Sequence, residues 1–176
     1  SAIQPMARIA NLLLTEYAEL LRKRTHTLLG SPTVSIGVIR GGTQPNIVPE
    51  SCSVEVDRRT IPGETEASVL AEIHRLLKKH RLPSTTIVES RGVPCPSLET
   101  DPDLPAVQQF LRAAKRRKSH GVDYFTDASP IAMGGTPAIV FGPGDIAQAH
   151  SADEWVDLTQ LDQAAAIVLR FLREQP

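Results

Sequence analysis

The sequence predicts an α/β protein in two parts: a ferredoxin-like α+β domain that lacks its first strand, then a portion of an α/β layer. The first half runs helix, strand, strand, helix, strand, which is the βαββαβ order without its opening strand. A proline-rich joint at residues 91–96 then changes the composition. Beyond it, amphipathic helices flank a short apolar run, as is typical of α/β layers. We therefore expect two domains, residues 1–91 and 92–176.

The composition excludes several classes of protein. The 176 residues are 41% hydrophobic and 22% charged with a formal net charge of −1, which is ordinary for a chain with a buried core. No apolar run approaches the ~20 residues of a membrane span, and no signal peptide is recognisable, so we expect no membrane partner. Near-neutral charge argues against nucleic acid as the main partner, and the basic run at residues 115–118 is interpreted as a solvated helix end. Two cysteines without CxxC spacing predict reduced thiols and a cytoplasmic location.

The first domain begins with a helix followed by a hairpin. Apolar residues recur every three or four positions over residues 3–21, which predicts one amphipathic helix. The sequence starts at Ser1 and enters this helix directly, so we expect that a segment is missing before it. Alternating apolar residues over 34–40 and again over 52–56, on either side of a turn-rich loop, predict a β-hairpin.

A second helix and a third strand complete this domain. Thr65 and Ser68 are candidate caps for a helix whose apolar positions extend over residues 69–77. Residues 85–88 then predict a strand that completes the sheet.

The second domain contains two predicted helices and one predicted strand. A helix starts at Asp103, with Pro105 tolerated in its first turn. The apolar run at residues 139–141, bounded by proline and glycine, predicts a buried parallel strand. Asp157 or Thr159 is expected to cap the last helix.

The glycine-rich loop at residues 142–155 concentrates the reactive side chains. It follows the predicted strand, and open α/β sheets bind ligands at the carboxyl ends of their strands. The loop contains His150, although a lone loop histidine is more often an ordinary surface residue. No HExxH, Walker, GxSxG or GxGxxG motif is present, so zincin, P-loop, hydrolase-elbow and Rossmann interpretations lack their motifs. The remaining histidines have charged neighbours in or beside predicted helices and are interpreted as surface residues: His26, His74, His80 and His120.

Three separated stretches resemble the M20 metallopeptidase family. They occur in the family's order: GVIRGGTQPNIVP at residues 37–49, VDRRTIPGE at 56–64 and GPGDIAQAHSADEW at 142–155. Within the family, the sequence is similar to acetylornithine deacetylase and succinyl-diaminopimelate desuccinylase-like enzymes. The resemblance implies a catalytic α/β domain that binds two zinc ions, interrupted by a ferredoxin-like lid that also forms the dimer. Residues 1–91 would then be the lid from its first helix onward, and residues 92–176 the final third of the zinc-peptidase-like catalytic domain.

The resemblance also implies roles for individual residues. His150 matches the family's last metal ligand, and Arg59 matches the lid arginine that holds a substrate carboxylate. Asn46 matches the lid asparagine that reaches substrate across the dimer interface, although an Asx turn explains it equally well. Gly142 and Gly144 are expected to bring backbone amides to the substrate or metal. Other positions are interpreted structurally: Thr126 and Asp127 as a helix cap, Arg40 and Arg58 as exposed strand charges.

The activity that the resemblance implies is metal-assisted hydrolysis of the amide bond of N-acyl amino acids or small peptides. The complete active site would hold two zinc ions (Zn2+), with Co2+ as an alternative, in a homodimer formed through the lid. The family's other metal ligands and its general base precede the lid, so we expect the 176-residue chain to bind zinc weakly and to be inactive alone. Two other interpretations stay open: a non-catalytic dimerisation or binding module derived from such an enzyme, and an RRM-like nucleic-acid-binding domain, which the 4% aromatic content disfavours.

Overall fold

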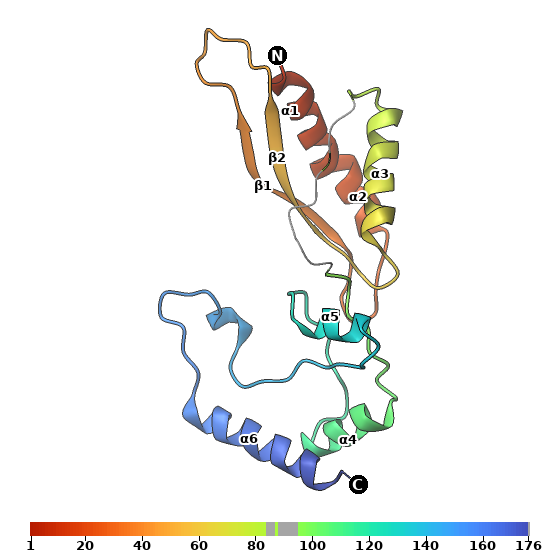
Figure 1. Ribbon diagram of the computed structural model, residues 1–176, viewed down its shortest axis with the longest axis vertical. Helices are drawn as coiled ribbons and strands as arrows, with labels where there is room; N and C mark the ends of the chain where they lie inside the picture. The colour runs from red at the N-terminus through yellow and green to blue at the C-terminus, as the bar shows by residue number, and fades with distance from the viewer. Residues whose placement is uncertain (84–86, 88–94, 176) are drawn as a thin grey trace. The chain divides into compact units, whose positions relative to one another are not determined.

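The computed structural model describes residues 1–83, 87 and 95–175 (Figure 1). The chain folds as two compact units: residues 1–98 with residues 121–125, and residues 99–120 with residues 126–176. Most of the predicted strand at 85–88 and most of the predicted joint at 91–96 lie outside the described residues. No helix in the described part of the chain is long and apolar enough to cross a bilayer.

The first unit opens with a continuous helical segment that contains one π-helical turn. α1 (Ile3–Leu12) passes into the π turn (Leu13–Tyr17) and then into α2 (Ala18–Arg22). At the end of the π turn, the Ala18 amide donates to the carbonyl of Leu13, five residues earlier. The helix predicted over residues 3–21 is confirmed, but hydrophobic periodicity does not distinguish a single π turn from an α turn.

An antiparallel hairpin follows, which confirms the predicted pair of strands. It consists of β1 (Thr33–Gly41) and β2 (Cys52–Arg59). Gly41 pairs with Cys52 beside the connecting loop, and Thr33 pairs with Arg59 at the opposite end. The two strands form the one sheet found among the described residues.

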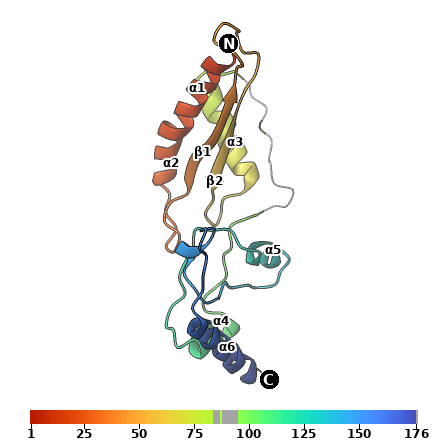
Figure 2. The same ribbon diagram turned by 90° about the vertical axis from the view of Figure 1, so that its left-hand side faces the viewer.

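α3 (Glu66–Lys79) begins after Thr65, one of the two predicted cap candidates, and the other candidate, Ser68, completes a capping box with it. The Ser68 amide donates to Thr65 Oγ1 at 3.1 Å, and the Thr65 amide donates to Ser68 Oγ at 3.0 Å. Figures 1 and 2 show α1, α2 and α3 side by side on one face of the hairpin. The core between the helices is formed by buried residues of these segments: Ile9, Leu12, Leu13, Tyr17, Leu21, Leu76 and Leu77.

Residues 121–125 belong to this first unit although they follow a stretch of the second. Gly121 lies so close to Leu28 that a Cβ at position 121 would be 2.4 Å from the Leu28 carbonyl oxygen. Because backbone oxygen cannot be approached that closely by carbon, this position requires glycine.

The second unit is helical in its described residues. It contains α4 (Pro105–Ala113), α5 (Ala128–Met133), a short 3-10 turn (Ile146–Gln148) and α6 (Leu158–Arg173). α4 starts at Pro105 and not at the predicted Asp103, because the fixed φ of proline suits the first helical position.

α4 packs against the C-terminal half of α6. The Phe110 ring makes edge-to-face contacts with Phe141 and Phe171, with centroids 4.9 and 5.2 Å apart. Gln109 Nε2 donates to the Glu174 carbonyl at 2.7 Å. At the other end of α6, Asp157 caps the helix by accepting from the Thr159 amide at 2.7 Å, which confirms one of the two predicted caps.

The strand predicted at residues 139–141 is wrong for this structure. These residues have no strand geometry, and their side chains are about 40% exposed: Ile139 41%, Val140 43% and Phe141 40%. A strand needs a neighbour to accept and donate its backbone hydrogen bonds, and the described residues of the second unit contain none.

Candidate functional site

The end of β2 places two consecutive arginines on opposite faces of the hairpin. Arg59 lies on the exposed face, where Nε donates to Asp57 Oδ2 at 2.7 Å and Nη1 donates to the Asp123 carbonyl at 3.1 Å. The Arg58 side chain points to the helices and is 8% exposed. Its interpretation as an exposed strand charge is therefore wrong, because alternation along the strand turns this side chain into the interior. Arg40 is exposed as expected and pairs with Glu55 across the hairpin.

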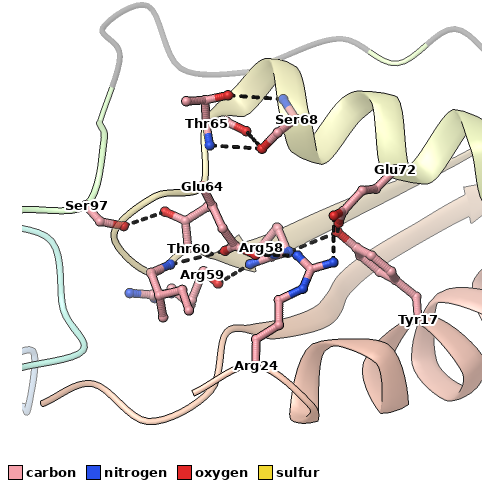
Figure 3. Close-up of polar contacts among 11 residues, drawn as sticks. Tyr17, Arg24, Arg58, Arg59, Thr60, Glu64, Thr65, Ser68, Glu72 and Ser97 are labelled. Carbon is pink, nitrogen blue, oxygen red and sulfur yellow. Dashed lines mark hydrogen bonds and ion pairs between the residues drawn. The ribbon is translucent and has the colours of Figure 1, made fainter. Parts of the chain in front are cut away.

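A network of buried and half-buried charges surrounds Arg58 (Figure 3). Glu64 Oε1 accepts from Arg58 Nη2 at 2.7 Å and from Arg24 Nη1 at 2.6 Å. Its other oxygen accepts from the Ile61 amide at 3.2 Å, which closes the turn between β2 and α3. Glu72 pairs with Arg24 at 2.6 Å. Two arginines and two glutamates thus neutralise one another beside the core.

The network controls the ionisation of its members. Burial by itself raises the pKa of Glu64, but the hydrogen bonds from Arg58, Arg24 and the Ile61 amide outweigh burial and hold that pKa below its usual range. Burial raises the pKa of Tyr17, whose hydroxyl accepts from Arg58 Nε at 3.1 Å. At neutral pH the Glu64 carboxylate is therefore charged and the Tyr17 phenol is protonated.

Asn46 lies in the exposed loop that connects β1 to β2. The Ile47 amide donates to the Gln44 carbonyl at 3.1 Å, which folds the loop into a turn. Among residues 1–83, the Asn46 side chain makes no hydrogen bond, so the Asx turn that the sequence allowed is absent there. Because Asn46 is near the loop end of the hairpin and Arg59 at its other end, one copy of the first unit does not bring these two side chains together.

The glycine-rich loop of the second unit is fastened to the start of α6. Gly144 has a φ of 93°, and its amide donates to Gln160 Oε1 at 2.8 Å. His150 has a φ of 63°, an uncommon value for a non-glycine residue, and its amide donates to Glu154 Oε2 at 3.1 Å. Gly142 lies earlier in the same loop and is exposed. Gly142, Gly144 and His150 therefore share one ordered loop.

No complete catalytic zinc site is present among the residues that the structure describes. A catalytic zinc ion needs about three protein ligands. His150 is exposed, and among residues 1–83, 87 and 95–175 no group of three or more histidine, cysteine, aspartate or glutamate side chains could hold a metal. Asp127 is the N-cap residue of α5 without a side-chain bond, while Thr126 Oγ1 accepts from the Ala128 amide at 3.2 Å. The capping interpretation thus holds for the threonine.

Sequence reasoning did not find the partners of Arg58 and Arg59. Tyr17, which accepts from Arg58, and Arg24, which shares Glu64 with it, are far from residue 58 along the chain, and no local pattern brings them together. The Asp57 side chain was accessible to sequence reasoning, because residues two apart on a strand share a face. The backbone carbonyl of Asp123 was not, since its approach depends on the path of the whole chain.

Comparison with known proteins identifies relatives of both halves. Residues 1–85 match the peptidase dimerisation domain family M20_dimer. The Bacillus subtilis N-formyl-4-amino-5-aminomethyl-2-methylpyrimidine deformylase is 29% identical over 98% of this chain and 45% of its own length. An acetylornithine deacetylase of Proteus mirabilis is 34% identical over 74% of this chain and 34% of its own. An N-acetyl-L-citrulline deacetylase of Xanthomonas campestris is 30% identical over 78% of this chain and 38% of its own length.

A solved structure has the same fold. It is the M20 family metallo-carboxypeptidase Sso-CP2 from Sulfolobus solfataricus, with a TM-score of 0.60 at 16% identity, covering 93% of this chain and 44% of that protein. The chain spans less than half the length of each of these relatives. The order of the motifs, the dimerisation domain match and the shared fold lead to one conclusion: this chain belongs to the M20 family of metallopeptidases, and residues 1–85 are its dimerisation domain.

Proposed function

We propose that this chain is the lid and the C-terminal catalytic portion of a hydrolase that cleaves the amide bond of N-acyl amino acids or small peptides. One observation carries the proposal: relatives named as deacetylases and a deformylase match the chain over 74% to 98% of its length. The deformylase match, over 98% of the chain, includes both the lid and the loop of His150. On this proposal the domain division is the one expected from the sequence, residues 1–91 and 92–176, with residues 121–125 folding back onto the lid.

Arg59 is proposed to bind the carboxylate of the substrate. Its planar guanidinium suits a carboxylate, and its position on the exposed face of the hairpin leaves it accessible. Asn46 is proposed to reach substrate bound to the partner copy, because it lies at the far end of the hairpin from Arg59. Gly142 is proposed to present its backbone amide to the substrate. Gly144 is proposed to do the same once its amide leaves the Gln160 Oε1 atom to which it donates in this structure.

His150 is proposed as one metal ligand, through its neutral imidazole. The complete site would use zinc to activate water and to stabilise the oxyanion of the hydrolysed amide, with Co2+ as an alternative metal. The remaining ligands would come from polypeptide beyond the residues of this chain. The exposed apolar side chains of α6 support this idea, because they offer a surface for such polypeptide: Leu158, Leu161, Val168, Leu169 and Leu172.

The first experiment measures zinc content, mass in solution and hydrolysis of N-acetyl-L-ornithine on the purified 176-residue chain. We expect a metal-free, inactive homodimer assembled through the dimerisation domain. Tightly bound zinc or turnover by this chain would contradict the proposed incompleteness. A monomer at all concentrations would contradict the proposed dimer.

The second experiment tests the activity itself. Residues 1–176 replace the matching region of the Proteus mirabilis acetylornithine deacetylase, and the chimera is compared with its Arg59→Ala and His150→Ala variants. We expect zinc-dependent hydrolysis that Arg59→Ala reduces mainly through KM and that His150→Ala abolishes with loss of bound zinc. A folded, zinc-loaded chimera that hydrolyses none of the relatives' substrates would refute the proposal.

A non-catalytic dimerisation module is the second candidate function. It is favoured by the family match to residues 1–85 and by the lack of a three-ligand cluster among the described residues. Concentration-dependent dimerisation together with an inactive chimera would select it. Both candidates are compatible with the cytoplasmic location proposed from the two cysteines, Cys52 and Cys95, which form no disulfide with each other.

A further inference from the structure

The Arg59 guanidinium is held at two of its three nitrogens. Nε donates to Asp57 Oδ2 at 2.7 Å, and Nη1 donates to the Asp123 carbonyl at 3.1 Å. Among the described residues no acceptor lies on Nη2. Both Nη2 hydrogens therefore remain for a ligand, and the two contacts restrict the directions in which they point.

The backbone beneath Arg59 is also fixed. Arg58 donates through Nη1 to the carbonyl of Arg59 and through Nη2 to Glu64, so the buried ion pair holds the last residues of β2 (Figure 3). Glu64 in turn accepts from the Ile61 amide. Movement of the Arg59 side chain is thus confined to its own rotamers, which Asp57 restricts.

A second exposed ion pair on the same hairpin can be compared with the pair of Asp57 and Arg59. Glu55 pairs with Arg40 through the terminal Nη1 nitrogen, and both side chains are more than 60% exposed. The shorter Asp57 side chain, two residues from Arg59 on the same strand face, contacts Nε. Asp57 therefore leaves the terminal amino groups less obstructed than Glu55 leaves those of Arg40.

We propose that Asp57 is a positioning residue for Arg59: it holds the guanidinium by Nε so that Nη2 is presented to a carboxylate ligand. This proposal rests on the proposed role of Arg59 in substrate binding. Asp57 itself touches no substrate in this arrangement. Its negative charge also repels the incoming carboxylate. If positioning dominates, removal of the Asp57 side chain weakens carboxylate binding, and if repulsion dominates, removal strengthens it.

The test is an NMR titration of the 176-residue chain with N-acetyl-L-ornithine, followed at the Arg59 Nε–Hε group. The methyl ester of the same compound, which lacks the carboxylate, is the ligand control. Asp57→Ala should weaken carboxylate binding by roughly fivefold, because orientation is lost. Asp57→Asn, which retains an oxygen acceptor for Nε, should restore most of the affinity. Glu55→Ala, at the matched exposed pair, should change the affinity less than twofold.

The outcomes separate this proposal from the one on which it rests. Tighter binding by Asp57→Ala would overturn positioning and establish electrostatic competition. A wild-type Arg59 signal that responds equally to acid and ester would refute the carboxylate role of Arg59. In that case 15N relaxation of Arg59 Nε, measured without ligand, still tests the positioning role. The motion of the Nε–Hε group should be restricted in the wild type and in Asp57→Asn, and unrestricted in Asp57→Ala. An Nε that is equally mobile in all three chains would refute the positioning role of Asp57.

Discussion

Arg58 and Arg59 are neighbours in the sequence but differ in burial and in the partners of their guanidinium groups. The Arg58 side chain is 8% exposed and shares Glu64 with Arg24, whereas the Arg59 side chain is 50% exposed. A buried charge is stable only while its partners remain, while an exposed one is compensated by water. The same residue type thus serves structure at one position and is available for binding at the next.

Glu64→Ala should destabilise the first unit strongly. The substitution leaves the buried Arg58 guanidinium without its carboxylate, and breaking a buried pair in this way costs about 3 kcal/mol. Urea unfolding of the purified chain measures the loss. Glu55→Ala, which removes an exposed pair on the same hairpin, should change the unfolding midpoint little. Equal effects of the two substitutions would contradict the structural role assigned to Glu64.

The first unit should lose stability in acid. The pKa of Glu64 is held below its usual value of 4.5 by Arg58, Arg24 and the Ile61 amide, which outweigh burial. The stabilisation is therefore present above pH 4.5 and is lost as the pH falls through the lowered pKa, because the unfolded chain takes up the proton first. Urea midpoints between pH 7 and 3 check this. In Glu64→Gln the decline should be shallower, with a remainder from Glu16, whose pKa is lowered chiefly by Lys79. A Glu64→Gln variant whose urea midpoint declines with pH as steeply as that of the wild type would contradict this role of Glu64.

At the scale of the element, two helices end in the same way. After α3, Arg81 has a φ of 51° and the Leu82 amide donates to the Leu77 carbonyl at 3.0 Å. After α4, Lys115 has a φ of 54° and the Arg116 amide donates to Leu111 at 2.9 Å. Both are Schellman motifs in which a charged residue occupies the left-handed position that glycine prefers.

Arg81→Gly and Lys115→Gly should therefore each stabilise the chain by about 0.5–1 kcal/mol, because glycine adopts a positive φ without steric strain. The free energy of unfolding, measured with urea, checks both. Lys78→Gly, inside α3, is the control and should destabilise by about 1 kcal/mol. Loss of stability in the first two variants would show that their side chains make contacts that outweigh the strain.

The sequence predicted those elements whose causes are local. The capping box of Thr65 and Ser68, the Asp157 cap and the alternation along β1 all act within a few residues, and each was found. The polar partners of Arg58 and the backbone partners that a strand at residues 139–141 would need lie in segments distant in the sequence. Periodicity does not report such neighbours, so these features were missed.

The residues of the candidate site likewise divide into those that local sequence motifs predicted and those that only the structure revealed. Arg59, Asn46, Gly142, Gly144 and His150 were selected from motifs that lie within short stretches, and their roles stay predictions. Alternation along the strand places Asp57 on the face of Arg59, whereas the Asp123 carbonyl became visible as a partner of Arg59 through the geometry alone. Motifs thus select candidate side chains, whereas the fold decides which groups orient them.

At the scale of the whole molecule, the apolar surface is distributed unevenly. Leu158, Leu161, Leu169 and Leu172 on α6 are 48% to 74% exposed. Such a face favours self-association in water. We expect species larger than a dimer at high concentration, and Leu161→Lys with Leu169→Lys should reduce them in sedimentation experiments while the far-UV signal of helix is kept. A wild-type chain that never exceeds a dimer would contradict this expectation.

Residues 121–125 have a consequence for how the chain is made. They complete the first unit beside Leu28 and Arg59, yet the ribosome synthesises them after residues 99–120 of the second unit. During translation, residues 1–98 emerge before the acceptor on Asp123 exists, so the base of the lid is finished late. A lid expressed as residues 1–98 alone would lack this segment, and the natural boundary for expressing it lies beyond residue 125.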